Sequence, residues 1–106
     1  MLLQQLRDER AIPELAAALR DADGQVRQMA ARALGMLGDP RCLHSLLDAL
    51  DDPAESVRLE AVLGLGAIGD TRAVPALLPL ATADSADLRY AATWALGSIG
   101  DARAVD

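Results

Sequence analysis

The sequence predicts an all-α fold, an α-solenoid of antiparallel helix pairs with about seven helices. Three observations support this prediction: a unit that repeats without gaps, a helical spacing of apolar residues within each unit, and a Gly-Asp pair at the end of each unit. A constant period of roughly 20–50 residues marks architectures in which each unit buries its apolar face against its neighbours.

The repeated unit is 31 residues long and fills residues 10–40, 41–71 and 72–102 without a gap. Residues 1–9 match the end of such a unit, and residues 103–106 match its beginning. We therefore expect a single repeat domain over residues 1–106, made of a half unit, three full units and the start of a truncated fourth. Several positions hold the same residue in all three units, namely Leu34, Leu65 and Leu96, Gly35, Gly66 and Gly97, and the pairs Gly38-Asp39, Gly69-Asp70 and Gly100-Asp101.

Each unit contains the pattern of two helices separated by a turn. In the first unit two runs of apolar residues have helical spacing, Ile12, Leu15, Ala16 and Leu19, then Val26, Ala30, Leu34 and Leu37. The segment 21–24 between these runs consists mainly of turn residues. Across the chain, helices are expected over residues 2–7, 11–20, 24–37, 41–50, 55–68, 73–81 and 86–99. Pro79 lies inside the sixth of these and lacks a backbone donor, so a kink or an early end is expected there.

The Gly-Asp pairs predict where one helix ends and the next begins. Gly38 follows the second helix of its unit, where a left-handed residue without a Cβ is favoured. Asp39 then offers a side-chain acceptor to the N–H groups that open the next helix. Because these connections are short, successive helices should be antiparallel.

The units follow the pattern VRxxAAxALGxIGDxRAVPxL with substitutions, and over residues 10–102 this pattern resembles the HEAT-like repeats named after phycobilisome lyases. It is equally similar to the repeat of consensus-designed binding scaffolds of that family. The resemblance implies a solenoid whose second helices line the concave surface. It implies no single function, because such repeats occur in scaffolds, chromophore lyases, a metal-dependent hydroxylase and DNA glycosylases.

Composition favours a soluble, cytoplasmic chain without a nucleic-acid partner. The chain has 106 residues, a net charge of −6 and no lysine. Nucleic-acid binding depends on a basic surface, because counterion release from the phosphates drives it. No apolar run reaches the roughly 18 residues of a membrane span, and Met1 does not open a secretory signal. The bias towards Arg, Ala, Asp and Gly suggests a bacterial or archaeal source.

Residues able to carry out chemistry are scarce, so we predict no enzyme, no metal site and no cofactor. His44 is the single histidine, and one imidazole cannot build the multi-ligand sites that metals need. Cys42 lies two residues before it, so on a helix the two side chains point in different directions. Segment 21–24 is similar to the start of a calcium loop, but the twelfth position holds Arg32 in place of Glu. Its aspartates are better interpreted as helix caps.

An arginine recurs beside the apolar stripe of each second helix, as Arg27, Arg58 and Arg89. We expect these side chains to form a structural ladder of ion pairs to loop aspartates such as Asp39, Asp70 and Asp101.

One pattern predicts a binding surface on the second helices. The side opposite the apolar stripe, found by turning about 100° per residue, carries residues that differ between units. These are Gln28, Arg32 and Met36, then Leu59, Leu63 and Ala67, then Tyr90, Trp94 and Ser98. An exposed apolar cluster marks a contact surface, and Trp and Tyr often contribute most to binding. The predicted partner-binding residues, expected on one solvent-facing surface, are Leu59, Leu63, Tyr90, Trp94, Gln28, Arg32, Met36 and Glu60.

We therefore predict a non-catalytic protein–protein interaction module that binds a protein or peptide on the face of its second helices. The alternative is a fragment or accessory subunit of a tetrapyrrole (bilin) lyase-like enzyme, in which the same groove would hold a chromophore. For Trp94 two other environments stay open, packing beside the last unit and burial in a homodimer. Because neither end shows a polar capping unit, we also expect a piece of a longer chain or a homo-oligomer, either a dimer or an end-to-end assembly.

Overall fold

The computed structural model describes the backbone of residues 2–105 and the side chains of residues 10–101. Its six α-helices and three short 3₁₀ segments are, in order, α1 (Leu2–Ala18), α2 (Gly24–Leu37), η1 (Pro40–Cys42), α3 (Leu43–Ala49), α4 (Glu55–Ile68), η2 (Thr71–Ala73), α5 (Val74–Leu77), η3 (Leu78–Thr82) and α6 (Ala86–Val105). Residues 2–105 contain no β-strand, and the all-α fold class is confirmed.

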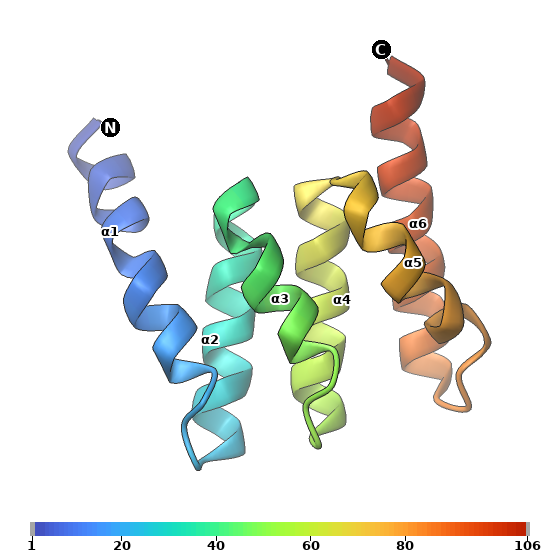
Figure 1. The fold of residues 1–106 in the computed structure, drawn as a ribbon, viewed down its shortest axis with the longest axis horizontal. Helices are drawn as coiled ribbons and strands as arrows, with labels where there is room; N and C mark the ends of the chain where they lie inside the picture. Colours follow the sequence, from blue (N-terminus) through green and yellow to red (C-terminus); the bar gives the residue numbers. More distant parts are fainter. Residues whose placement is uncertain (1, 106) are drawn as a thin grey trace.

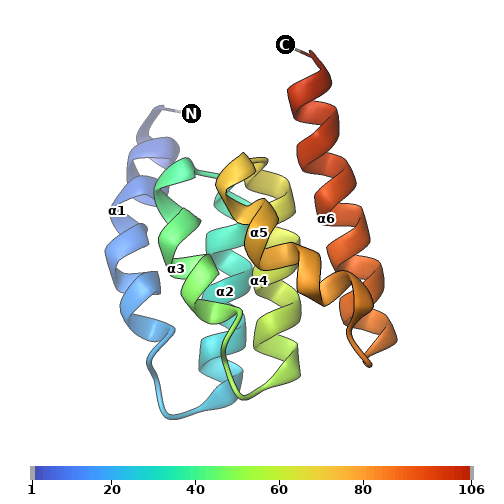
Figure 2. The ribbon, with the colours of Figure 1, turned by 45° about the vertical axis from the view of Figure 1, so that its right-hand side comes forward.

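The helices form a slab two layers thick. One layer consists of α2, α4 and α6, with α4 packed between the other two (Figure 1). The second layer consists of α1, α3 and α5, which pack against α2, α4 and α6 respectively (Figure 2). The slab measures 38 × 38 × 17 Å. This is the arrangement expected for a solenoid of sequential antiparallel helix pairs.

The expected count of seven helices is wrong, because α1 is continuous. The segments 2–7 and 11–20, expected as separate helices, join in one helix from Leu2 to Ala18. Arg7 stands where the later units have Gly38 and Gly69, and a residue with a Cβ is disfavoured in the left-handed conformation that ends α2 and α4. The chain therefore lacks the glycine that ends a helix at this position, and α1 also continues through Pro13.

The second helix of the third unit also differs from its expectation. An end is expected at Gly100, but α6 continues to Val105. Among residues 2–105 only Gly38 and Gly69 have a positive φ, of 60° and 75°. Glycine permits a left-handed turn without enforcing one, and both turns that form are followed by a helix that packs back on the second helices. The side chains of residues 103–106, expected to open a fourth unit, lie outside the described part of the chain.

The two remaining helix signals are confirmed. Asp39 and Asp70 accept hydrogen bonds of 2.9 and 2.8 Å from the backbone N–H of Arg41 and Arg72. Near Pro79, α5 ends at Leu77 and the chain continues as a 3₁₀ segment over Leu78–Thr82. In the described part of the chain, no helix combines the length and the apolar character needed to cross a bilayer.

Leucines at repeated positions form the core between the two layers. Leu34 of α2 and Leu65 of α4 are fully buried, together with Leu46 and Leu77 from the first helices. Leu96, at the corresponding position of α6, is only partly buried. The core is therefore closed around α4 and partly open beside α6.

Candidate functional site

The second helices approach one another closely at two points, and these contacts place their outer side chains next to one another. A Cβ added to Gly35 would lie 2.8 Å from the Cα of Gly64. A Cβ added to Gly66 would lie 2.9 Å from the Cα of Ala95. Real Cβ atoms do not come this close to a backbone, so α2, α4 and α6 are in near backbone contact at these points.

A groove of about 370 Å³ runs between α2 and α4 on their outer side. Two apolar side chains beside it reach solvent, Met36 with 80% and Leu63 with 40% of its surface exposed. The residues that line the groove are Arg32, Gly35, Met36, Glu60, Leu63, Gly64 and Ala67. Four of the predicted partner-binding residues are thus brought together, whereas the glycines and Ala67 were not among those predicted. Gly35 could have been found from the sequence, since it recurs in every unit, whereas the position of Gly64 is held by Ala33 and Ala95 in the other units.

Tyr90 and Trp94 extend the exposed apolar surface onto α6. Tyr90 is 76% exposed and Trp94 is 51% exposed. The Cζ3 atom of Trp94 lies 2.6 Å from the position that a Cβ on Gly66 would occupy. The indole therefore rests with one edge over α4 and exposes the remainder to solvent. Leu63 precedes Gly66 by one helical turn, so the indole and Leu63 are neighbours on the same side of α4.

Three predicted residues do not have the expected solvent-facing position. Leu59 is partly buried and packs against the hydrophobic core, which corrects its assignment to the exposed patch. Gln28 and Glu60 are both half-buried, and Nε2 of Gln28 donates to Oε2 of Glu60 over 3.5 Å. The spacing along one helix could not reveal this, because a neighbouring helix covers these positions. The surface that does face solvent, called here the second-helix face, consists of Arg32, Met36, Leu63, Tyr90 and Trp94.

The expected ion-pair ladder exists in a different form. Each of the three repeated arginines donates through Nη1 to two carbonyl oxygens, five and six residues earlier, in the loop before its own helix. The contacts are 2.7–3.1 Å long and join Arg27 to Asp21 and Ala22, Arg58 to Asp52 and Pro53, and Arg89 to Ala83 and Asp84. The arginines therefore hold the loop that turns the first helix of a pair into the second.

The predicted aspartate partners of this ladder, Asp39, Asp70 and Asp101, are wrong. Asp39 and Asp70 pair instead with the arginine two residues later, at 2.7 Å to Arg41 and 2.8 Å to Arg72. These side-chain and backbone hydrogen bonds lower the pKa of both carboxyls to about 2. The reason is position along the helix, because Arg27 and Arg58 lie in the first turns of α2 and α4, whereas Asp39 and Asp70 follow the opposite ends of these helices, about 18 Å away.

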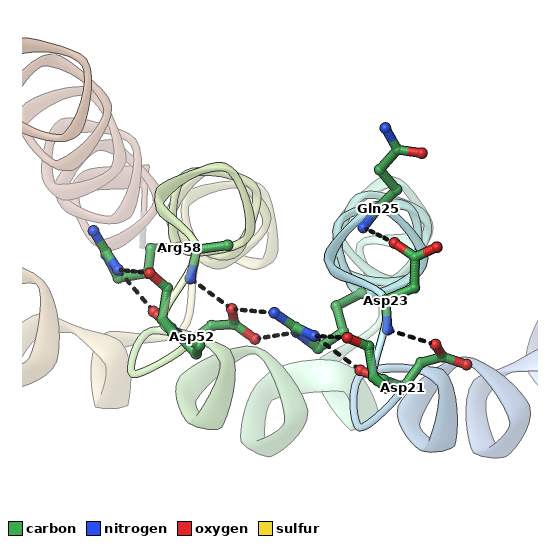
Figure 3. A network of polar contacts seen from close by, with 9 residues as sticks. Asp21, Asp23, Gln25, Asp52 and Arg58 are labelled. Carbon is green, nitrogen blue, oxygen red and sulfur yellow. Dashed lines mark hydrogen bonds and ion pairs between the residues drawn. The ribbon is translucent and has the colours of Figure 1, made fainter.

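One arginine also connects two units. Nε of Arg27 donates to Oδ2 of Asp52 over 2.8 Å, and Oδ1 of Asp52 accepts from the backbone N–H of Ala54 (Figure 3). Partial burial of Asp52 raises its pKa, but the hydrogen bonds from Arg27 and Ala54 outweigh this effect and hold the pKa below its usual value. In Figure 3 the loop with Asp21 and Asp23 lies beside the corresponding loop with Asp52. The contact ties the first unit to the second and lies away from the second-helix face.

Among the described side chains, Cys42 and His44 lie in different environments. Cys42 is buried, and desolvation, with a contribution from the negative charge of Asp39, raises the pKa of its thiol. His44 is exposed on α3, in the layer away from the second-helix face. Among the described side chains, no group of three or more His, Cys, Asp or Glu residues could hold a metal ion.

The comparisons with known proteins agree with this geometry. A family model for HEAT repeats matches residues 1–56 and, in a second match, residues 43–106. The two matches overlap and together span the chain, although they identify HEAT repeats in general and no particular type. No curated protein matches the chain.

Proposed function

The chain belongs to the HEAT repeat family, and on that premise we propose that it is an interaction module that binds a protein or peptide on its second-helix face. HEAT repeats generally act as protein-interaction scaffolds and are typically non-catalytic. The observation that supports the proposal is the exposure of Met36, Leu63, Tyr90 and Trp94 on one layer of helices.

The chemistry of the second-helix face favours a segment with apolar side chains. One such side chain would fit between Met36 and Leu63, which border the same groove. Another would contact the exposed part of the Trp94 indole. A half-exposed indole that already rests on a neighbouring helix loses little conformational freedom on binding, and such anchors contribute much of the binding energy in interfaces.

The charged residues beside the groove indicate where an acidic residue of the partner would bind. Arg32 is exposed at the edge of the groove, whereas Glu60 on its other side is half-buried and accepts a hydrogen bond from Gln28. An acidic residue of the partner would therefore be attracted to the Arg32 edge, and this contact should weaken as salt is raised.

The alternative of a tetrapyrrole lyase-like subunit has no support of its own in the structure. The described part of the second-helix face contains neither a histidine nor a cysteine, and the Cys42 thiol is buried on another element. When a bilin is mixed with the protein, the visible absorption band of the bilin should therefore stay unchanged.

The proposal can be tested with a displayed library of random peptides selected against the protein. Trp94→Ala should weaken binding of the enriched peptides by about 2 kcal/mol or more, which is roughly 30-fold. Its matched control is Leu78→Ala, because Leu78 is exposed to a similar degree, 56% against 51%, but lies on η3 in the other layer. Equal loss of binding in both variants, or no peptide that depends on Trp94, would refute the proposal.

Stability must be measured beside binding, since the indole also packs on Gly66. Leu34→Ala removes a fully buried side chain and should cost roughly 2–5 kcal/mol of unfolding free energy. Trp94→Ala should cost clearly less, because half of the ring already faces solvent. If the two variants melt alike, Trp94 is a core residue and its loss of binding says nothing about the face.

A further inference from the structure

The outer side of α6 carries a set of positions that are covered in the other two second helices. Its exposed residues are Arg89, Tyr90, Thr93 and Gly97. The residues at the same repeat positions are half-buried or buried in both preceding units, Arg27, Gln28, Ala31 and Gly35 on α2, and Arg58, Leu59, Val62 and Gly66 on α4. In α2 and α4 these positions are covered by the following second helix. On α6 the same surface faces solvent.

The opposite end of the molecule carries the other half of the same interface. An apolar groove of about 390 Å³ lies between α1 and α2, and it is lined by Leu15, Ala18, Val26, Met29, Ala30 and Ala33. One unit later, the positions of Val26 and Ala30 are held by Val57 and Ala61, which are fully buried. Met29, in contrast, is 71% exposed. Ala33, which also lines the groove, has the repeat position of Gly64, the residue by which α4 contacts Gly35 of α2. The groove therefore lies on the side of α2 that corresponds to the side by which α4 packs on α2.

We propose that these two surfaces bind each other between two copies of the chain, so that α2 of one copy packs on α6 of the next. The repeat translates each contact inside the chain into a contact between copies. Adding 62, the length of two units, to a residue of α2 gives the corresponding residue of α6 in the first copy. Subtracting 31, the length of one unit, from its contact in the second unit gives the corresponding residue of the second copy. Three such pairs test whether the surfaces are complementary.

The first pair is a steric match. Gly35 meets Gly64, and Gly66 meets Ala95, at the points of near backbone contact. The translated pair is Gly97 with Ala33 of the second copy. No atom lies within 4 Å of the position that a Cβ on Gly97 would occupy, so this site is open. A Gly–Ala pair is the combination that already packs between α4 and α6.

The second pair is an apolar match. Gln28 contacts Glu60 inside the chain, and the translated positions hold Tyr90 and Met29. Both are strongly exposed, at 76% and 71%. Contact between the two copies would therefore cover two large apolar side chains at once, where the internal contact joins two polar ones.

The third pair is a charge match. Arg27 binds Asp52 across the first interface, and the translated positions hold Arg89 and Asp21. Arg89 makes the same two carbonyl contacts as Arg27. Oδ1 of Asp21 accepts from the backbone N–H two residues later, as Oδ1 of Asp52 does, so the same hydrogen bond holds both carboxylates. At the interface between α4 and α6, the acceptor position holds Ala83. The carboxylate is therefore absent from that interface and occurs again in Asp21 on the surface that would meet α6 of another copy.

Continuity with the internal interface and this charge pair identify the occupant as a second copy. The two surfaces differ, so the contact is head-to-tail and does not close on itself. Each added copy exposes a new α6 surface, and assembly should continue with rising concentration. Of the second-helix face only Tyr90 would be covered in such an assembly, and Arg32, Met36, Leu63 and Trp94 would remain exposed. Binding of a peptide to Trp94 can therefore succeed or fail independently.

Sedimentation equilibrium of two blocked variants tests the proposal. Gly97→Gln fills the open site on α6, and Ala33→Gln fills its counterpart on α2. We expect the wild-type mass to rise above the single-chain value of 11.1 kDa with concentration, and each variant alone to stay at that value. An equal mixture of the two should form a dimer and nothing larger, because each variant keeps the surface that the other lacks.

Two controls make the result decisive. Ala67→Gln places the same side chain at an exposed position of the groove between α2 and α4, and it should associate like the wild type. Thermal melts should show all three variants folded. A wild type that stays a single chain at millimolar concentration would overturn the proposal, as would a mixture that does not dimerise or blocked variants that associate unchanged.

Discussion

The contact between α2 and α4 and the contact between α4 and α6 use the same repeat positions but differ in what surrounds the point of closest approach. The first pairs Gly35 with Gly64 and leaves no Cβ between the helices. The second pairs Gly66 with Ala95 and accommodates one Cβ. Beside the first contact lies an open groove, whereas the indole of Trp94 covers the second.

The polar side-chain contacts across the two helix–helix contacts also differ. Arg27 reaches Asp52 across the first contact, but Arg58 has Ala83 at the corresponding place. Across the second contact, the Ser98 hydroxyl donates to the carbonyl oxygen of Gly66 over 3.0 Å. The comparison teaches that small residues at the closest approach determine how the helices pack. The positions around them then determine what the outer surface presents.

The largest effect is expected from adding a Cβ to the tighter contact. In Gly64→Ala the new atom would lie 2.8 Å from the Cα of Gly35 and 2.9 Å from Cδ1 of buried Leu46. Overpacking of this kind should lower the free energy of unfolding by about 1–3 kcal/mol, even though alanine is the better helix former. Urea denaturation at low protein concentration measures the change.

The matched control is Gly97→Ala, on the same helix layer but in open space. With no clash to oppose it, the higher helix propensity of alanine should raise the free energy of unfolding by up to about 1 kcal/mol. A neutral or stabilising Gly64→Ala would mean that α2 and α4 separate without cost, and the distinction between the two contacts would fail.

A smaller effect is expected from the ion pair that only the first contact has. Asp52→Ala removes the acceptor of both Arg27 and the Ala54 N–H, and the side chains of Arg27 and Asp52 are only 16% and 9% exposed. We expect a loss of about 1–2 kcal/mol of unfolding free energy, measured by urea denaturation.

The converse change is Ala83→Asp, which places a carboxylate where Arg58 can reach it. Because surface pairs contribute little, the gain should stay below about 1 kcal/mol. Combining Ala83→Asp with Arg58→Gln should abolish this gain. If the gain persists in the combined variant, it comes from the loop and not from the new pair.

The smallest effect is expected at the caps of η1 and η2, which follow α2 and α4 and have the same aspartate in both units. Folding lowers the pKa of Asp39 and Asp70 to about 2, below the usual aspartate value of about 3.9. Their stabilising contribution should therefore be fully present above about pH 4 and be lost as the pH falls through about 2. Thermal melts of the wild type and of Asp39→Asn, Asp70→Asn across this range should converge at the acid end. A difference that is constant with pH would show that these carboxyls do not titrate with unfolding.

Sequence reasoning was most accurate where helix ends depend on local residues. The second helices of the first two units match their expected ranges, 24–37 and 55–68. Each ends at a glycine in the left-handed conformation, a preference that belongs to the residue itself. The same reasoning failed at residues 7–11 and at Gly100, where a helix continues unless the fold around it makes a turn favourable.

In the candidate site, too, the features that depend on one helix could be predicted and those that depend on a neighbouring helix could not. Met36, Leu63, Tyr90 and Trp94 could be found from helical spacing, because the side opposite a buried stripe faces away from the core. The burial of Leu59, the bond between Gln28 and Glu60, and the partner of Arg27 could not be found in this way. Each depends on a residue of a neighbouring helix.

The 31-residue repeat alone determined that this protein is a stack of helix pairs, because no unit can bury its apolar face by itself. Only the tertiary structure decided which repeated positions are covered and which stay open. Gly35, Gly66 and Gly97 are one residue in one local pattern, yet the first two are in backbone contact and the third faces open space. The reason is physical: burial depends on the helix that packs alongside, and the local sequence is the same whether or not that helix is there.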